Sequence, residues 1–195
     1  MKERGMIFNG EMVRAILDGG KTQTRRPVKV PHIDRDAMCE LSGNELAGEL
    51  SAGNYRNSPH GKPGDRIWVR ETWARYNIDQ DSHDMAYRAT PPAGWPEEGR
   101  WRPSIHMPRW ASRLILEITG VRVERLQAIT LGDICKEIGC GLYDFRPATY
   151  GFQVWEELWK SIYCEENWQA NPWVWVIEFK VVPNVQANST GSDLR

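Results

Sequence analysis

The sequence has no long apolar segment and no signal-peptide core. Its longest purely apolar run is the five-residue segment 173–177, far short of the roughly 20 residues that cross a bilayer. The first ten residues, MKERGMIFNG, contain charged and polar side chains instead of an apolar h-region. We therefore expect a cytoplasmic protein with no membrane partner.

The cysteines and histidines lack the spacing of metal ligands. They are Cys39, Cys135, Cys140, Cys164, His32, His60, His83 and His106. Structural zinc sites need closely paired ligands such as C-x-x-C, and none is present. The sequence therefore predicts no metal site and no cofactor, and it predicts free thiols in a reducing cytosol.

The chain also has almost no net charge, with 25 Lys and Arg against 26 Asp and Glu. The charges are nevertheless segregated. Residues 1–30, 61–76 and 100–125 are net basic, whereas residues 31–60, 77–99 and 133–166 are net acidic. Arginine outnumbers lysine by 18 to 7, which favours the planar group that binds phosphate bidentately. Basic blocks indicate a nucleic-acid partner, but acidic segments that simply pair with them would explain the same pattern.

Periodicity and turn signals predict a mixed fold. Strands are expected at 6–8, 66–73, 85–89, 113–126 and 173–182, with Gly120 as a bulge, and helices at 9–17, 131–138 and 149–163. In the last helix Phe152, Trp155, Trp159 and Ile162 form a stripe that predicts core packing. Strands and helices without regular alternation indicate an α+β fold around a small barrel or curled sheet.

The remaining segments predict loops. Residues 31–60 are rich in Gly, Ser, Asn and acids, with a weakly helical stretch at 36–50, and we expect a surface insertion that carries little core. A second insertion is expected at about 77–99. Residues 1–182 would then form a single domain, and residues 183–195 a flexible tail.

A basic segment follows the first helix. Gly20-Lys21-Thr22 is not a phosphate loop, because the earlier glycine of that motif would fall at Ala15. The segment from Lys21 to Arg26 could bind an anion through its Lys, Arg and hydroxyl donors. A solvated basic turn is the simpler alternative.

Glu71 lies on the apolar face of the strand predicted at 66–73, because it shares parity with Ile67, Val69 and Trp73. A buried carboxylate needs a cationic partner. Lys21 is one candidate and an arginine is another. With Lys21 as partner the pair could support chemistry, with Thr24 as nucleophile; with an arginine it would be structural.

Aromatic and basic residues interleave in WRPSIHMPRW, residues 101–110. Nucleobases stack on tryptophan while arginine binds the phosphate. His106 in this segment is either a general acid or a hydrogen-bonded loop residue.

Four segments together resemble ASCH-domain proteins, and most closely the longer versions carried by phages and prophages. They are MVRAILDGGKTQTRRPV, PGDRIWVRETWA, WRPSIHMPRWASRLILEITGVRVERL and NPWVWVIEF. The resemblance implies a PUA-like fold, a small β-pseudobarrel with about three flanking helices and surface insertions, of a kind that often binds RNA.

Small bacterial ASCH amidohydrolases remove the acyl group from N4-acylated cytidine. The resemblance implies Lys21 as base, Thr24 as nucleophile and Glu71 as the group that orients water. The residues expected to bind nucleic acid or substrate are Arg25, Arg26, Arg70, Trp73, His106, Arg109 and Trp110. The partner would be RNA or a modified nucleoside, or DNA. The alternatives are a non-catalytic nucleic-acid-binding accessory protein of a phage or prophage, a ribonuclease, and a protein-interaction factor.

Overall fold

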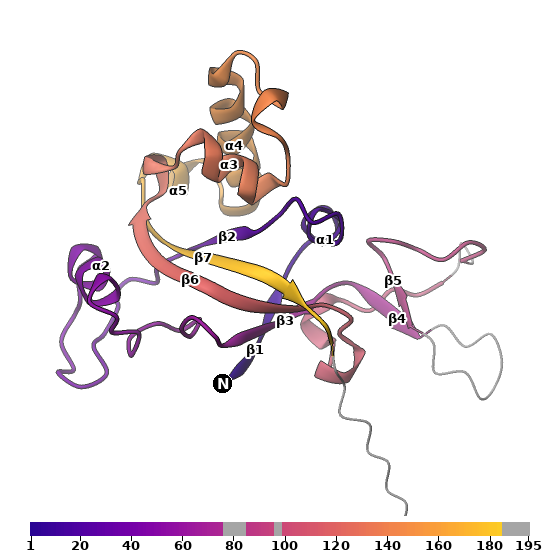
Figure 1. Cartoon of the computed structure of the whole chain (residues 1–195), viewed down its shortest axis with the longest axis horizontal. Helices are drawn as coiled ribbons and strands as arrows, with labels where there is room; N and C mark the ends of the chain where they lie inside the picture. The colour runs from indigo at the N-terminus through magenta and orange to yellow at the C-terminus, as the bar shows by residue number, and fades with distance from the viewer. Residues whose placement is uncertain (76–84, 96–98, 185–195) are drawn as a thin grey trace, which may run out of the picture.

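A five-stranded mixed sheet organises the chain. The computed structural model describes residues 1–75, 85–95 and 99–184. The strands, in spatial order, are β1 (Glu3–Ile7), β3 (Arg66–Arg70), β6 (Ile115–Arg125), β7 (Trp173–Val182) and β2 (Gln23–Pro27). Only the β1–β3 pair is parallel. The long β6 and β7 curve through the middle of the molecule (Figure 1), and their register shifts between Ile118 and Gly120, which confirms the predicted bulge.

The first segment of the chain supplies both edges of this sheet. Helix α1 (Gly10–Leu17) connects β1 at one edge to β2 at the other. Asn9 caps α1 by accepting a hydrogen bond from the Met12 amide. Arg26 on β2 donates a hydrogen bond of 2.8 Å to the carbonyl of Ile7 and lies over the Phe8 ring. A side chain therefore links the two edges of the curled sheet.

The concave side of the sheet encloses the larger apolar core. Phe8 and Val13 pack there with strand residues such as Ile67 and Ile177. Helix α2 (Gly43–Ser51) lies within the segment 31–60 and contributes buried Leu46 and Leu50 to the same core. The expectation that this segment carries little core is therefore wrong. A short apolar face within a polar, acidic sequence was too weak a signal to reveal it.

A second core forms between the opposite face of the sheet and three helices, α3 (Leu131–Ile138), α4 (Ala148–Tyr163) and α5 (Glu165–Gln169). These helices gather beyond β2 and β7 in Figure 1. The Thr130 hydroxyl caps α3 as its spacing from Asp133 predicted. Five α-helices occur in the described ranges, where three were expected.

Only the middle of the predicted apolar stripe on α4 is buried. Trp155 and Trp159 are enclosed, whereas Phe152 and Ile162 are 41% and 43% exposed. At 1.5 Å per residue, α4 is about 24 Å long and α3, which packs on it, about 12 Å. The predicted core packing is therefore confirmed for Trp155 and Trp159, whereas Phe152 and Ile162 lie outside the core.

The strand predicted at 66–73 is two strands. β3 ends at Arg70, and β4 (Trp73–Arg75) pairs with β5 (Met85–Tyr87) in a separate two-stranded sheet. Residues 77–84 and 96–98 of the insertion expected at 77–99, and nearly all of the tail expected at 183–195, lie outside the described residues. Among the residues that are described, no helix has the length and apolar character needed to span a bilayer.

Candidate functional site

Lys21 is completely enclosed between the start of β2 and α3. It is 1% exposed, and its Nζ donates to the carbonyl oxygens of Gln23, at 2.7 Å, and Glu137. The Glu137 carboxylate lies 3.4 Å from the same Nζ. Burial lowers the pKa of Lys21, although Glu137 acts in the opposite direction and the nearby Arg26 and Arg25 add to the lowering. Glu137, which sequence reasoning missed, is therefore the carboxylate partner of Lys21.

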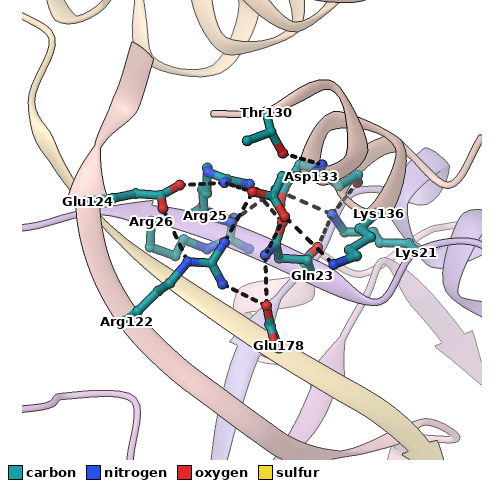
Figure 2. A network of polar contacts seen from close by, with 11 residues as sticks. Lys21, Gln23, Arg25, Arg26, Arg122, Glu124, Thr130, Asp133, Lys136 and Glu178 are labelled. Carbon is teal, nitrogen blue, oxygen red and sulfur yellow. Dashed lines mark hydrogen bonds and ion pairs between the residues drawn. The ribbon is translucent and has the colours of Figure 1, made fainter. Parts of the chain in front are cut away.

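Arg25 is the centre of a polar network between β2, β6 and α3 (Figure 2). Its guanidinium is buried and lies 2.6 Å from Glu124 and 3.6 Å from both Asp133 and Glu137. Its own backbone N–H donates to Glu137 at 3.0 Å. With its charge and its amide both engaged inside the molecule, Arg25 has a structural role.

Arg122 on β6 completes the network from the solvent side. It bonds Glu124 at 3.1 Å, Asp133 at 3.3 Å and Glu178 at 2.6 Å. Burial raises the pKa of Asp133, but the charges of Arg122 and Arg25 outweigh it, so the pKa is lowered overall. For Lys21 and Arg25, the alternative that acidic residues pair with the basic ones is the one observed.

Thr24 faces the other way. Because side chains alternate along a strand, Thr24 projects from the face of β2 opposite to Gln23 and Arg25. It pairs with Ile177, whose side chain lies in the concave core. The Thr24 hydroxyl is buried and has no hydrogen-bond partner among the described residues. An unpaired buried hydroxyl costs stability, so packing alone does not explain a threonine at this position.

Glu71 is buried, as its strand parity predicted, and its partner is Arg113. Two hydrogen bonds of 2.9 Å join the guanidinium to the two carboxylate oxygens. Arg113 also lies over the Tyr87 ring, 4.1 Å from its centre, and bonds the Thr90 hydroxyl. Of the two partners considered from the sequence, the structural arginine is the one present.

A cavity of about 420 Å³ opens beside Glu71. Its other lining residues come from the first two turns of α1 and from the segments at 72 and 88–89: Asn9, Gly10, Glu11, Arg14, Thr72, Arg88 and Ala89. Arg14 donates to the Ala89 carbonyl and so connects the two walls. Arg88 is exposed, with no ion pair among the described residues. The cavity thus presents one uncommitted guanidinium near a fixed carboxylate.

The three residues predicted to be catalytic lie in different surroundings. Glu71 lines the cavity at the start of α1, whereas the Lys21 amide bonds Ala15, in the last turn of that helix. Thr24 faces the concave core and Lys21 faces α3. No hydrogen bond or ion pair within the described ranges joins any two of the three, so their joint role stays a prediction.

The aromatic and basic segment forms a surface around β4. Arg75 lies over Trp110 and Arg102 over Trp73, with the two tryptophan rings edge to face at 5.9 Å. Trp73 is buried beneath this layer, whereas Trp110 is half exposed. These stacked pairs place guanidinium and indole groups side by side at the surface.

The other predicted binding residues have varied surroundings. Arg70 donates to the Ile105 carbonyl and lies over Trp68. Arg109 bonds Glu3 at 2.9 Å. His106 is exposed at the end of a short 3-10 helix (Ser104–His106). In the part of the chain that is described, no group of three His, Cys, Asp or Glu side chains is arranged to hold a metal ion.

Comparisons with known proteins give one structural likeness. No protein-family model matches the sequence, and no curated protein matches it. The chain is similar to a solved structure, the ASCH domain from Lactobacillus crispatus JV V101, at 14% identity and a TM-score of 0.42, over 93% of this chain and 80% of that one. A likeness of this degree carries no argument about fold, activity, ligand or a phage origin.

Proposed function

We propose that this protein is a PUA-like ASCH domain that binds RNA and receives one unstacked nucleotide in the cavity between α1 and Glu71. The observation that carries the proposal is the cavity itself. Its volume of about 420 Å³ falls within the range typical of small-ligand sites. Arg88 can bind a phosphate there, and the buried Glu71 carboxylate can accept a hydrogen bond from a base amine.

The surface that continues from the cavity supports the same function. Glu71 and Thr72 line the cavity, and the next residues along the chain, Trp73 and Arg75, belong to the stacked arginine and tryptophan layer. Single-stranded RNA binds such layers because bases stack on aromatic or guanidinium planes while phosphates meet cations. A strand entering the cavity would therefore find further contacts for its neighbouring nucleotides.

Fluorescence anisotropy with a labelled single-stranded RNA tests this proposal. We expect salt-dependent binding that Arg88→Ala weakens several-fold, with the slope of log affinity against log salt reduced by about 1. Lys136→Ala is the matched control, because Lys136 is exposed on α3, away from the cavity. Equal affinity for wild type and Arg88→Ala would contradict the cavity as the binding site. Shortening of the labelled RNA during the titration would favour the ribonuclease alternative.

A second candidate, the amidohydrolase, is favoured by the buried amine of Lys21 with its lowered pKa and by the unpaired hydroxyl of Thr24. Incubation with N4-acetylcytidine should then release cytidine. Thr24→Val separates chemistry from folding, because it removes a hydroxyl that makes no hydrogen bond and keeps the shape of the side chain. Turnover by wild type that Thr24→Val abolishes would support the enzyme; no turnover, or turnover unchanged in Thr24→Val, would remove it.

A further inference from the structure

A second hollow, distinct from the cavity beside Glu71, lies at the start of β1. It measures about 480 Å³. Its lining includes five cationic side chains, those of Lys2, Arg4, Arg35, Arg56 and Lys62, against a single carboxylate, that of Asp65. They come from three separate segments of the chain. Gathering like charges around one hollow is unfavourable unless an anion compensates them.

The carboxylate in the hollow is already committed to the fold. Asp65 is buried and accepts hydrogen bonds from the backbone N–H of Lys2, at 2.8 Å, and of Lys62, at 3.3 Å. Arg4 lies 3.5 Å from its second oxygen. Asp65 thus holds the two segments together and balances Arg4. Lys2, Arg35 and Lys62 have no ion-pair partner among the described residues.

The segment 31–60 contributes its basic residues, and none of its acidic ones, to the lining of this hollow. It is net acidic, yet its only two basic residues, Arg35 and Arg56, both line the hollow. Its acidic residues are used elsewhere: Asp34 and Glu49 accept hydrogen bonds from Asn57. The exception is Asp36, which pairs with Arg56 where both are exposed.

The remaining acids of the segment do not reach the hollow either. Glu45 completes the N-terminal capping box of α2, and Glu40 is exposed and does not line the hollow. None of the acidic residues of the segment lines the hollow, although Asp36 pairs with Arg56 and the charge of Arg56 also acts on Asp34. This placement is expected if the two arginines face a common anion.

At Gly61 the backbone passes close to two residues that line the hollow, Arg4 and Asp65. Gly61 is buried with a φ of +103°, and a Cβ there would lie 2.7 Å from both Arg4 Nη1 and Asp65 Oδ2. Only glycine therefore lets the chain pass this close to the arginine and aspartate. Lys62, the next residue along the chain, lines the hollow. Tyr55 lines it as well, with a half-buried ring.

We infer that this hollow is an anion site that binds a phosphate group of a nucleic acid, with Arg35, Arg56 and Lys62 as the phosphate contacts. Guanidinium groups bind phosphate bidentately and lysine binds it as a point charge. The inference goes beyond the proposed function, because the hollow shares no lining residue with the cavity beside Glu71. It also gives the segment 31–60 a role in binding.

Competition binding with the full chain tests the inference. A single-stranded RNA labelled at its 3′ end is prepared with a 5′-phosphate and with a 5′-hydroxyl, and inorganic pyrophosphate serves as competitor. For wild type we expect pyrophosphate to displace part of the binding. For Arg35→Ala and Lys62→Ala we expect several-fold weaker RNA binding, a salt slope smaller by about 1, and weaker competition by pyrophosphate. Lys136→Ala should match wild type.

The two RNA ends distinguish the source of the phosphate. Tighter binding of the 5′-phosphorylated RNA would assign the hollow to a terminal phosphate, and equal binding of the two would assign it to phosphates within the strand. If both variants bind RNA and pyrophosphate as wild type does, or if neither probe binds wild type, the inference is overturned. A loss in Arg35→Ala without one in Arg88→Ala would overturn the cavity proposal and leave this one standing.

Discussion

The guanidinium of Arg113 holds the carboxylate of Glu71 through two parallel hydrogen bonds, each 2.9 Å long. The two residues are 42 positions apart in the chain. Their pairing fixes Glu71 at one wall of the cavity beside α1. A carboxylate held in this way is oriented, so it can serve as an acceptor without first losing conformational freedom.

Glu71→Gln should lower the free energy of unfolding by about 2 kcal/mol, because it leaves the charge of a partly buried arginine without its counter-ion. Urea denaturation measures this change. Glu117→Gln is the control, since Glu117 pairs with the exposed Lys180, and loss of such a surface pair costs about 0–1 kcal/mol. Equal losses of stability in the two variants would show that the Glu71–Arg113 pair contributes no more than an exposed ion pair.

Arg25→Met should behave as a stability variant and not as a binding variant. It keeps the bulk of the side chain but leaves Glu124, Asp133 and Glu137 without their shared cation. We expect the free energy of unfolding to fall by about 3 kcal/mol. The RNA affinity of the folded fraction should stay as in wild type. Lost affinity with unchanged stability would instead favour the binding role predicted from the sequence.

Stability should fall as the pH is lowered below about 6.5, because of His60. Its ring packs edge to face on Trp175, and burial, followed by the charges of Arg26 and Arg4, lowers its pKa from 6.5 to about 4. Between these values the unfolded chain binds a proton that the folded chain does not. The stability contribution is therefore complete above pH 6.5 and is lost as the pH falls towards 4.

Between pH 7 and pH 5 the free energy of unfolding should fall by about 2 kcal/mol. Urea denaturation at several pH values measures it, and most carboxylates stay ionised over this range. His60→Gln should flatten the pH dependence. A wild-type stability that is constant from pH 7 to pH 5 would contradict the buried neutral histidine.

Leu46→Ala tests whether the segment 31–60 belongs to the core. Leu46 is 1% exposed and packs in the concave core, so its truncation should cost about 3 kcal/mol. Met38→Ala in the same segment should change stability by less than about 0.5 kcal/mol, because Met38 is 75% exposed. Similar small effects at both positions would show that α2 is dispensable.

The local elements could be predicted from the sequence where chain-local physics determines them. The strand at 173–182 and the helix at 131–138 match the structure at both ends. The former begins with the apolar run 173–177, and the latter has the Thr130 cap before it and Gly139, with a φ of +89°, after it. The burial of Glu71 also followed from strand parity alone.

The pairing of charges could not be predicted in the same way. Sequence reasoning offered Lys21 or an arginine as the partner of Glu71 without identifying the arginine. In the structure Glu71 meets Arg113, and Lys21 meets Glu137. Both ion pairs depend on how elements that are distant in the sequence pack together. Strand parity and motif spacing do not encode that packing. The same limit applies to the basic hollow, whose five cations come from three segments that only the fold brings together.

The connection of both sheet edges through α1 sets an order on how the chain can assemble during synthesis. β2 ends at Pro27, yet its sheet partner β7 is Trp173–Val182. β1 likewise waits for β3 at residue 66. β2 therefore has no strand partner until β7 is available, and contacts of such long sequence separation slow folding.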